Sequence, residues 1–148
     1  MLGNEFGQGI DISFTMDYGM SMVDGCNVTG GMDGIVTHSA MTDIADNKVS
    51  RTTMRGISMT EMSMGMIAHN EVRSARGVGI LCNDRSMCMI ERNTVVDTQA
   101  DSAGGDDSRA GFGVLVSFQS EADLRGNELA ANPVPMGSVT NSQIRATH

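Results

Sequence analysis

The chain has 148 residues, which is the usual size of a single domain. It carries 18 acidic against 10 basic residues, and this formal charge of −8 argues against a protein that binds nucleic acid through the phosphates. No apolar run approaches the roughly 20 residues of a membrane-spanning helix, and the first residues lack the basic and apolar regions of a signal peptide.

A six-residue pattern with Asn in its fourth place recurs along the whole chain. Its copies occupy residues 1–6, 23–28, 44–49, 67–72, 90–95 and 124–129. Successive copies lie 21 to 23 residues apart, except for the last interval of 34. Cys26 stands in the Asn place of the second copy. Internal repetition of this kind predicts a solenoid in which each repeat packs only on its neighbours.

A second pattern, Gly followed by an aliphatic residue, recurs with the first. It occurs at Gly9-Ile10, Gly34-Ile35, Gly56-Ile57, Gly79-Ile80 and Gly113-Val114. Apolar residues alternate with a period of two around both patterns, and the repeat is too short for a pair of helices. The sequence therefore predicts several short strands per repeat, joined by turns rich in Gly, Asn, Asp and Ser.

These repeats resemble the right-handed parallel β-helix of the pectate-lyase-like type, in the asparagine-rich version also seen in NosD-like proteins. The resemblance implies an all-β solenoid of about six coils of 21 to 23 residues each. We expect residues 1–148 to form one domain, with a loop insertion at 97–112 and a degenerate last coil at 130–148. Because the chain begins partway into a coil, we also expect it to be a fragment of a longer rod.

Equivalent residues of stacked coils form columns spaced by about 4.8 Å. An Asn at an inward turn both donates and accepts hydrogen bonds along its column, and it tolerates the left-handed backbone of such turns. We therefore expect a structural asparagine ladder rather than catalysis from Asn4, Asn47, Asn70, Asn93 and Asn127.

One corner of the expected coil carries candidate catalytic residues. The repeat alignment puts Glu61 and Asp84 on adjacent coils about 5 Å apart, with Arg85 next in sequence and His38 one column away. Two carboxylates at that separation suit acid–base chemistry on a glycosidic bond. The alternative is a polar turn, because turns favour Asp, Asn, Ser and Thr in any case.

The resemblance favours a carbohydrate-related or cell-surface protein that is secreted, periplasmic or displayed on the surface. The chain lacks the calcium-binding Asp cluster of pectate lyases, the Asp triad of polygalacturonases and the Asp-Pro-His motif of mannuronan epimerases. A non-catalytic binding or structural module is therefore the first hypothesis, with polysaccharide as its partner. A polysaccharide lyase, hydrolase or epimerase is the alternative, and a NosD-like copper-associated protein is the second alternative.

The methionines recur at alternate positions before the Asn pattern. One column holds Met20, Met41, Met64 and Met87, and a neighbouring column holds Met22, Met66 and Met89. If Ile67 and Ile90 face the core, the period of two directs these methionines outward. They would then form an interface for a partner chain, missing domain or lid, or a Cu(I) site at Met64, Met66, Met87 and Met89. If the parity is reversed, the columns belong to the core.

The insertion and the cysteines leave further alternatives open. Four aspartates of the insertion offer oxygen ligands for calcium, although a solvated loop is the simpler interpretation: Asp97, Asp101, Asp106 and Asp107. Cys26, Cys82 and Cys88 have no metal-binding spacing. We expect buried thiols at all three, with a Cys82–Cys88 bridge as the alternative.

Overall fold

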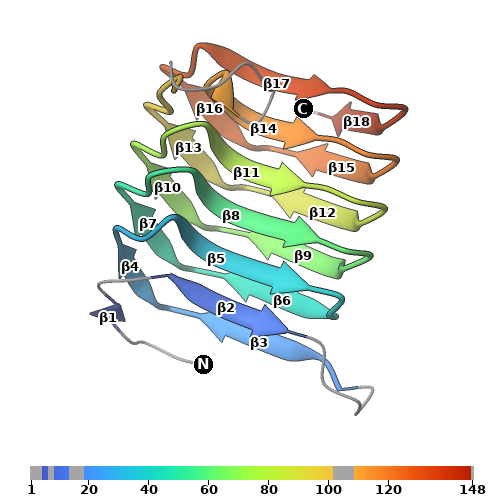
Figure 1. Ribbon diagram of the computed structural model, residues 1–148, viewed down its shortest axis with the longest axis horizontal. Helices are drawn as coiled ribbons and strands as arrows, with labels where there is room; N and C mark the ends of the chain where they lie inside the picture. Colours follow the sequence, from blue (N-terminus) through green and yellow to red (C-terminus); the bar gives the residue numbers. More distant parts are fainter. Residues whose placement is uncertain (1–4, 7–8, 14–18, 102–108, 148) are drawn as a thin grey trace.

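The computed structural model describes residues 5–6, 9–13, 19–101 and 109–147. Its strands form three parallel sheets of six strands each, which stack coil upon coil into a rod (Figure 1). Along the chain, each coil contributes one strand to sheet B, one to sheet C and one to sheet A. The all-β solenoid that the repeats predict is therefore confirmed. No helix in these ranges is long and apolar enough to cross a membrane.

The strands are short, and equivalent strands have similar lengths from coil to coil. Sheet B contains β1 (Glu5–Phe6), β4 (Asn27–Thr29), β7 (Lys48–Ser50), β10 (Glu71–Arg73), β13 (Thr94–Val96) and β16 (Glu128–Ala130). Sheet C contains β2 (Ile10–Ser13), β5 (Asp33–His38), β8 (Arg55–Thr60), β11 (Val78–Cys82), β14 (Phe112–Val116) and β17 (Val134–Ser138). Sheet A contains β3 (Ser21–Asp24), β6 (Thr42–Ala45), β9 (Met64–Ala68), β12 (Met87–Glu91), β15 (Glu121–Arg125) and β18 (Gln143–Thr147).

The register follows the sequence repeat. In sheet B, Val72 pairs with Val49 on one side and with Val95 on the other. The interval of 34 residues does not disturb this alignment, because Val95 still pairs with Leu129. The longer interval falls between β13 and β14, and the strands on either side of it keep the register of all three sheets.

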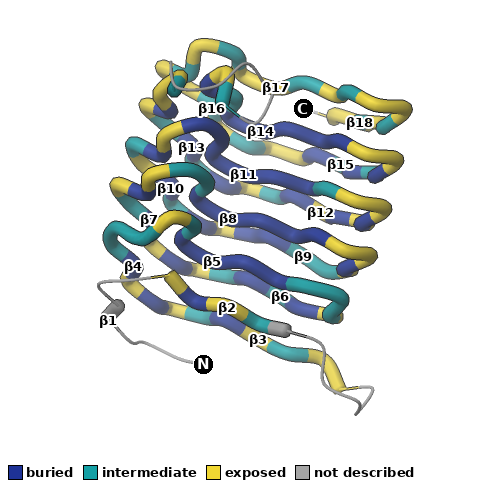
Figure 2. The backbone as a smooth tube through the Cα atoms, viewed as in Figure 1, coloured by how far each residue is buried: buried dark blue, intermediate teal, exposed yellow. Residues whose placement is uncertain are grey.

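A narrow core of aliphatic side chains fills the interior, and Figure 2 shows buried residues in coil after coil along the rod. It contains the aliphatic residue of each Gly-aliphatic pair, namely Ile10, Ile35, Ile57, Ile80 and Val114. Ile44, Ile67 and Ile90 of sheet A are also fully buried. Strand residues alternate between the two faces of a sheet, so the methionines beside these isoleucines point outward. The columns of methionines are thus not part of the core.

The asparagines lie at the turn between sheets A and B, where Asn47, Asn70 and Asn93 are buried and Asn127 is half-buried. Each amide donates to the side-chain oxygen of the next Asn at 2.9 to 3.0 Å. The Asn70 amide also donates to the carbonyl of Ile44 at 2.9 Å. Cys26 interrupts the column, but its backbone N–H still donates to Asn47 Oδ1. Asn4, the first expected member, lies outside the described residues.

Two of the three cysteines form a disulfide. Cys82 at the end of β11 is bonded to Cys88 in β12, across the turn between sheets C and A. The expectation of three thiols was therefore wrong for this pair, and it holds only for the buried Cys26. The pairing depends on two core-facing positions that meet across one turn, and residue spacing alone does not reveal this proximity.

Candidate functional site

The turn between sheets C and A forms a ridge of exposed side chains along one edge of the rod. Four of these turns contain two consecutive residues with left-handed backbone, namely Glu61-Met62, Asp84-Arg85, Phe118-Gln119 and Thr140-Asn141. Backbone hydrogen bonds join successive turns, as from the Met62 N–H to the Asp84 carbonyl at 2.8 Å. Equivalent side chains are therefore held at the spacing of the coils. We call these four pairs the turn ridge.

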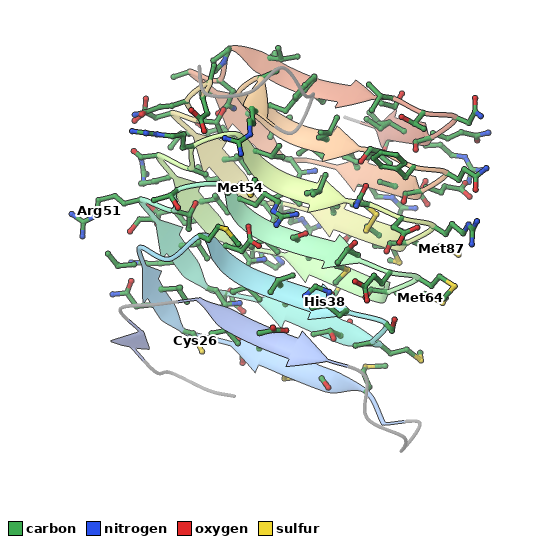
Figure 3. All side chains as sticks on the ribbon, in the orientation of Figure 1. Cys26, His38, Arg51, Met54, Met64 and Met87 are labelled. Atoms are coloured by element: carbon green, nitrogen blue, oxygen red, sulfur yellow. A yellow bond between two sulfur atoms is a disulfide. The ribbon has the colours of Figure 1, made fainter. Side chains whose placement is uncertain are left out.

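His38 lies at the end of β5, beside the turn ridge (Figure 3). Its Nδ1 is 3.3 Å from Glu61 Oε1, and its Nε2 is 3.7 Å from Asp11 Oδ1. All three side chains are accessible to solvent, with His38 the least exposed at 33%. The imidazole thus stands between two carboxylates, an arrangement that suits proton transfer when a substrate lies on this surface.

The structure separates the four candidate catalytic residues into two pairs. His38 contacts Glu61, whereas Arg85 extends toward the next coil, where its Nε donates to Gln119 Oε1 at 3.2 Å. Asp84 occupies the place in its turn that Glu61 occupies one coil before, and it is exposed. The carboxylate–imidazole contacts at this corner therefore join His38 to Asp11 and Glu61.

Asp11 is a partner of His38 that the sequence repeats by themselves do not indicate. Asp11 lies in β2, directly opposite Val36 in the adjacent strand β5. His38 is two residues farther along that strand, so the two side chains are diagonal neighbours on one face of sheet C. The contact could have been inferred by aligning β2 with β5, because both strands carry the Gly-aliphatic pattern and this pattern sets their register.

A second polar column runs next to the turn ridge on sheet C. The Asn83 amide donates to Thr60 Oγ1 at 3.4 Å, and the Ser117 hydroxyl donates to Asn83 Oδ1 at 2.7 Å. Thr60 also pairs in register with His38. These groups form a hydrogen-bonded column along the rod from the imidazole, in which Thr60 and Ser117 are buried and Asn83 is half-buried.

The outward face of sheet C is apolar farther from the ridge. Leu81 lies between the core residues Ile80 and Cys82, so it points to the opposite face, yet it is only 3% exposed. It belongs to a small separate cluster with Val78 and Leu115, against which Phe112 and Val139 pack. Alternation alone predicts solvent exposure here, and this cluster was not expected from the sequence.

The aspartates of the insertion do not form a calcium site in the described part. Asp101 binds Arg109 Nη1 at 2.5 Å, and Asp97 accepts a hydrogen bond from Ser74 at 2.8 Å. Asp106 and Asp107 lie outside the described residues. Within the described ranges, no three His, Cys, Asp or Glu side chains are grouped so as to hold a metal ion.

A groove of about 510 Å³ lies on the outward face of sheet A. It is lined mainly by methionines, namely Met20, Met41, Met64, Met66, Met87 and Met89. Thr42, Gly65 and Cys88 also line it. Asp43, Glu121, Asp123 and Arg145 add charged groups. We call this feature the methionine groove.

The right handed beta helix region family matches residues 6–147, so the chain belongs to this family and the coil is right-handed. No curated protein matches the chain significantly. Among solved structures, the chain is similar to the crystal structure of the periplasmic alginate epimerase AlgG, with a TM-score of 0.76 at 16% identity. That similarity covers 100% of this chain and 39% of the epimerase chain. At this identity the likeness shows the fold, and the chain spans well under half of the epimerase.

Proposed function

We propose that this chain is the β-helix module of a carbohydrate-related protein and that it binds an extended polysaccharide without cleaving it. The turn ridge carries the proposal. A linear polymer that runs along the rod meets an equivalent turn at every coil, and the polar side chains of these turns, such as Asp84 and Arg85, are exposed. Repeated hydroxyl, amide and charged groups on rigid coils provide the hydrogen bonds that orient such a ligand.

The comparisons support a role in carbohydrate biology. The epimerase with the same fold acts on alginate, a polysaccharide, although the present chain corresponds to 39% of it. A fold by itself does not fix an activity. The exposed polar side chains of the turn ridge are therefore the reason to assign polysaccharide binding to this chain.

We also infer that the protein works outside the cytoplasm. The Cys82–Cys88 disulfide supports this location, because such bonds persist in oxidising compartments and are rare where thiols are kept reduced. The structurally similar epimerase is periplasmic. This location is tested by titrating the thiols of the protein isolated from its native host and then unfolded. We expect one titratable cysteine per chain, and three would contradict the proposal.

Polysaccharide binding is tested with the variant Asp84→Asn/Arg85→Asn. Asn tolerates the left-handed backbone at both positions, so the fold is preserved while both charges are removed. Affinity electrophoresis against a panel of neutral and uronic-acid polysaccharides is expected to show retardation of the wild type and at least about tenfold weaker binding of the variant.

Arg51→Asn is the matched control for this experiment. Arg51 also has a left-handed backbone, at φ 55°, and it projects from the opposite edge of the rod (Figure 3). Its loss should leave the retardation unchanged. Equal weakening by both variants would point to general charge effects, and a wild type that no polysaccharide retards would disprove the binding function.

A second candidate function is acid–base catalysis on a bound polysaccharide. The observation that favours it is the imidazole of His38 between Asp11 and Glu61. His38 would move a proton at the sugar ring, and Glu61 would orient the imidazole of His38 through its Nδ1. This predicts an altered or cleaved polymer whose formation falls about 100-fold in His38→Gln. Unchanged polymers after prolonged incubation with the wild type, followed by NMR, would remove this candidate.

A further inference from the structure

The methionine groove contains a type of side chain that the core does not favour. Ten large apolar residues of the described chain are exposed, and nine of them are methionines, with Phe118 the exception. The core, in contrast, is built mainly from Ile and Val, and among the described residues Met59 is its one fully buried methionine. Exposed positions on strands ordinarily favour β-branched or polar residues. The property that these surface residues share is therefore the thioether rather than hydrophobicity alone.

Four of these thioethers form a rectangular array on two adjacent strands. Met64 pairs in register with Met87, and Met66 pairs with Met89. Paired positions are about 4.8 Å apart and alternate residues of one strand about 6.6 Å apart. Met64 and Met87 project from the same edge of the rod on successive coils (Figure 3). The long unbranched methionine side chain readily brings its sulfur toward a common point between four such positions.

The surroundings of the array favour a cation. Asp43, Glu121 and Asp123 line the same groove, and Arg145 pairs with the last two, which leaves an excess of negative charge. The Asp43 carboxylate is fixed beside the array, because it accepts the Met66 backbone N–H at 3.2 Å. A negative groove raises the local concentration of cations.

We propose that the methionine groove binds a soft monovalent metal ion, Cu(I) or Ag(I), through Met64, Met66, Met87 and Met89. Thioethers are soft ligands, and they select Cu(I)-like ions over the hard cations that carboxylates and water prefer. The neighbouring carboxylates attract the cation, and the thioethers provide the selectivity. The site is distinct from the polar turn ridge and does not depend on polysaccharide binding.

The test uses Ag(I) as the probe, with the disulfide intact and with Cys26→Ala as the background so that no thiol competes. Two-dimensional NMR of the methionine methyl groups is expected to show shifts for the four proposed ligands, Met64, Met66, Met87 and Met89, at one equivalent of Ag(I). A competition titration with a chromophoric chelator then gives the affinity for Cu(I), for which we expect a sub-micromolar dissociation constant.

The decisive variant replaces Met64, Met66, Met87 and Met89 by Leu. Leu keeps the apolar volume and removes only the sulfur, so the fold and any apolar docking are retained. We expect at least about 100-fold weaker metal binding, because all four proposed thioether ligands are removed. The control, Met32→Leu/Met62→Leu/Met136→Leu, removes three exposed thioethers outside the groove and should bind as the wild type does.

Each outcome decides the proposal. Equal metal affinity of the groove variant and the wild type would overturn it, as would equal weakening by the control variant, since that result means scattered thioether binding. Absence of methyl shifts with Ag(I) would overturn it without any variant. A further outcome is that neither the wild type nor the Leu variant retains metal, while both self-associate or bind a partner protein equally well. The groove is then an apolar docking surface instead of a metal site.

Discussion

Asn70 is buried and uses both ends of its side-chain amide for hydrogen bonds. Its side chain accepts from both the backbone and the amide of Asn47 and donates to the Ile44 carbonyl and to Asn93. Asn70→Ala leaves several of these buried groups without partners, and each such group costs about 1 to 3 kcal/mol. We expect the free energy of unfolding to fall by about 3 kcal/mol. Chemical denaturation followed by circular dichroism measures this loss.

Asn27→Ala is the control for that prediction, because Asn27 is an exposed strand residue one place after Cys26 in the interrupted turn. Surface replacements of this kind change stability by about 0.5 kcal/mol or less. Equal losses in the two variants would show that the buried column contributes no more than an ordinary surface amide. Asn70→Asp separates the two roles, since it keeps the acceptor oxygen and removes the donor.

Residues that repeat were easier to predict than residues that meet once. The column of Asn47, Asn70 and Asn93 follows from a pattern repeated at every coil, so periodicity and the hydrogen-bonding capacity of Asn were sufficient. The contact between Asp11 and His38 occurs in a single pair of coils and requires the register between two particular strands. The corner was therefore predictable as a location, and its detailed contacts were not.

At the scale of the element, the Gly-aliphatic pattern is explained by a tight corner where the chain passes from sheet B into sheet C. A Cβ on Gly79 would lie 2.3 Å from Val95 Cγ1 and 2.6 Å from the Gly113 carbonyl oxygen. Backbone cannot move aside as a flexible side chain would, so Gly79→Ala distorts the strand. We expect a loss of about 2 to 3 kcal/mol in unfolding free energy, measured by denaturant titration.

Gly126→Ala distinguishes this steric effect from backbone strain. Gly126 has φ +59°, and the nearest atom to an added Cβ is 3.6 Å away, at Arg92. This variant therefore has only the cost of a left-handed Ala, about 1 kcal/mol. A Gly79 variant as stable as the wild type would mean that the corner relaxes without cost.

The Cys82–Cys88 bridge fixes the turn between β11 and β12. It closes a loop with a sequence separation of 6, so the loss of chain entropy in the unfolded state amounts to about 2 kcal/mol. Cys82→Ala/Cys88→Ala should lower the free energy of unfolding by that amount. A thiol reductant should produce a similar loss in the wild type and none in the double variant. Insensitivity of the wild type to the reductant would contradict a stabilising bridge.

Alternation predicted the inward face of each strand but could not assign the outward faces. Met64 and Leu81 both occupy outward positions, yet Met64 is 45% exposed and Leu81 is 3% exposed. The difference depends on the side chains packed beside them on the same face, such as Leu115 next to Leu81. A single strand's pattern contains no information about these lateral neighbours.

At the scale of the whole molecule, the rod is a stack of interchangeable coils. Each strand pairs with the equivalent strand of the next coil, and every sheet keeps the same order of coils. Stability of such a solenoid is approximately a sum over coils and the interfaces between them. The three sheets can therefore differ in surface chemistry while the interior remains constant, with the turn ridge between sheets C and A and the methionine groove on the outward face of sheet A.

This architecture predicts that one complete coil is removable. Deleting residues 71–93 joins Asn70 directly to Thr94, which follows Asn93, the equivalent residue 23 positions later. The deletion removes β10, β11 and β12 together with both bridged cysteines, and each sheet closes with its register intact. We expect a shorter rod that still unfolds cooperatively, with a stability lower by about 1 to 3 kcal/mol.

Deletion of residues 71–81 is the matched control. It removes fewer residues but takes away β10 and nearly all of β11 while keeping β12, so sheets B and C would each lose a strand that sheet A retains. The chain would then have to cross the core to reach sheet A, and we expect it not to fold. Circular dichroism, size-exclusion chromatography and thermal unfolding compare the two deletions. If the larger deletion unfolds the protein as completely as the smaller one, stability depends on features of that particular coil rather than on the additive stacking of equivalent coils.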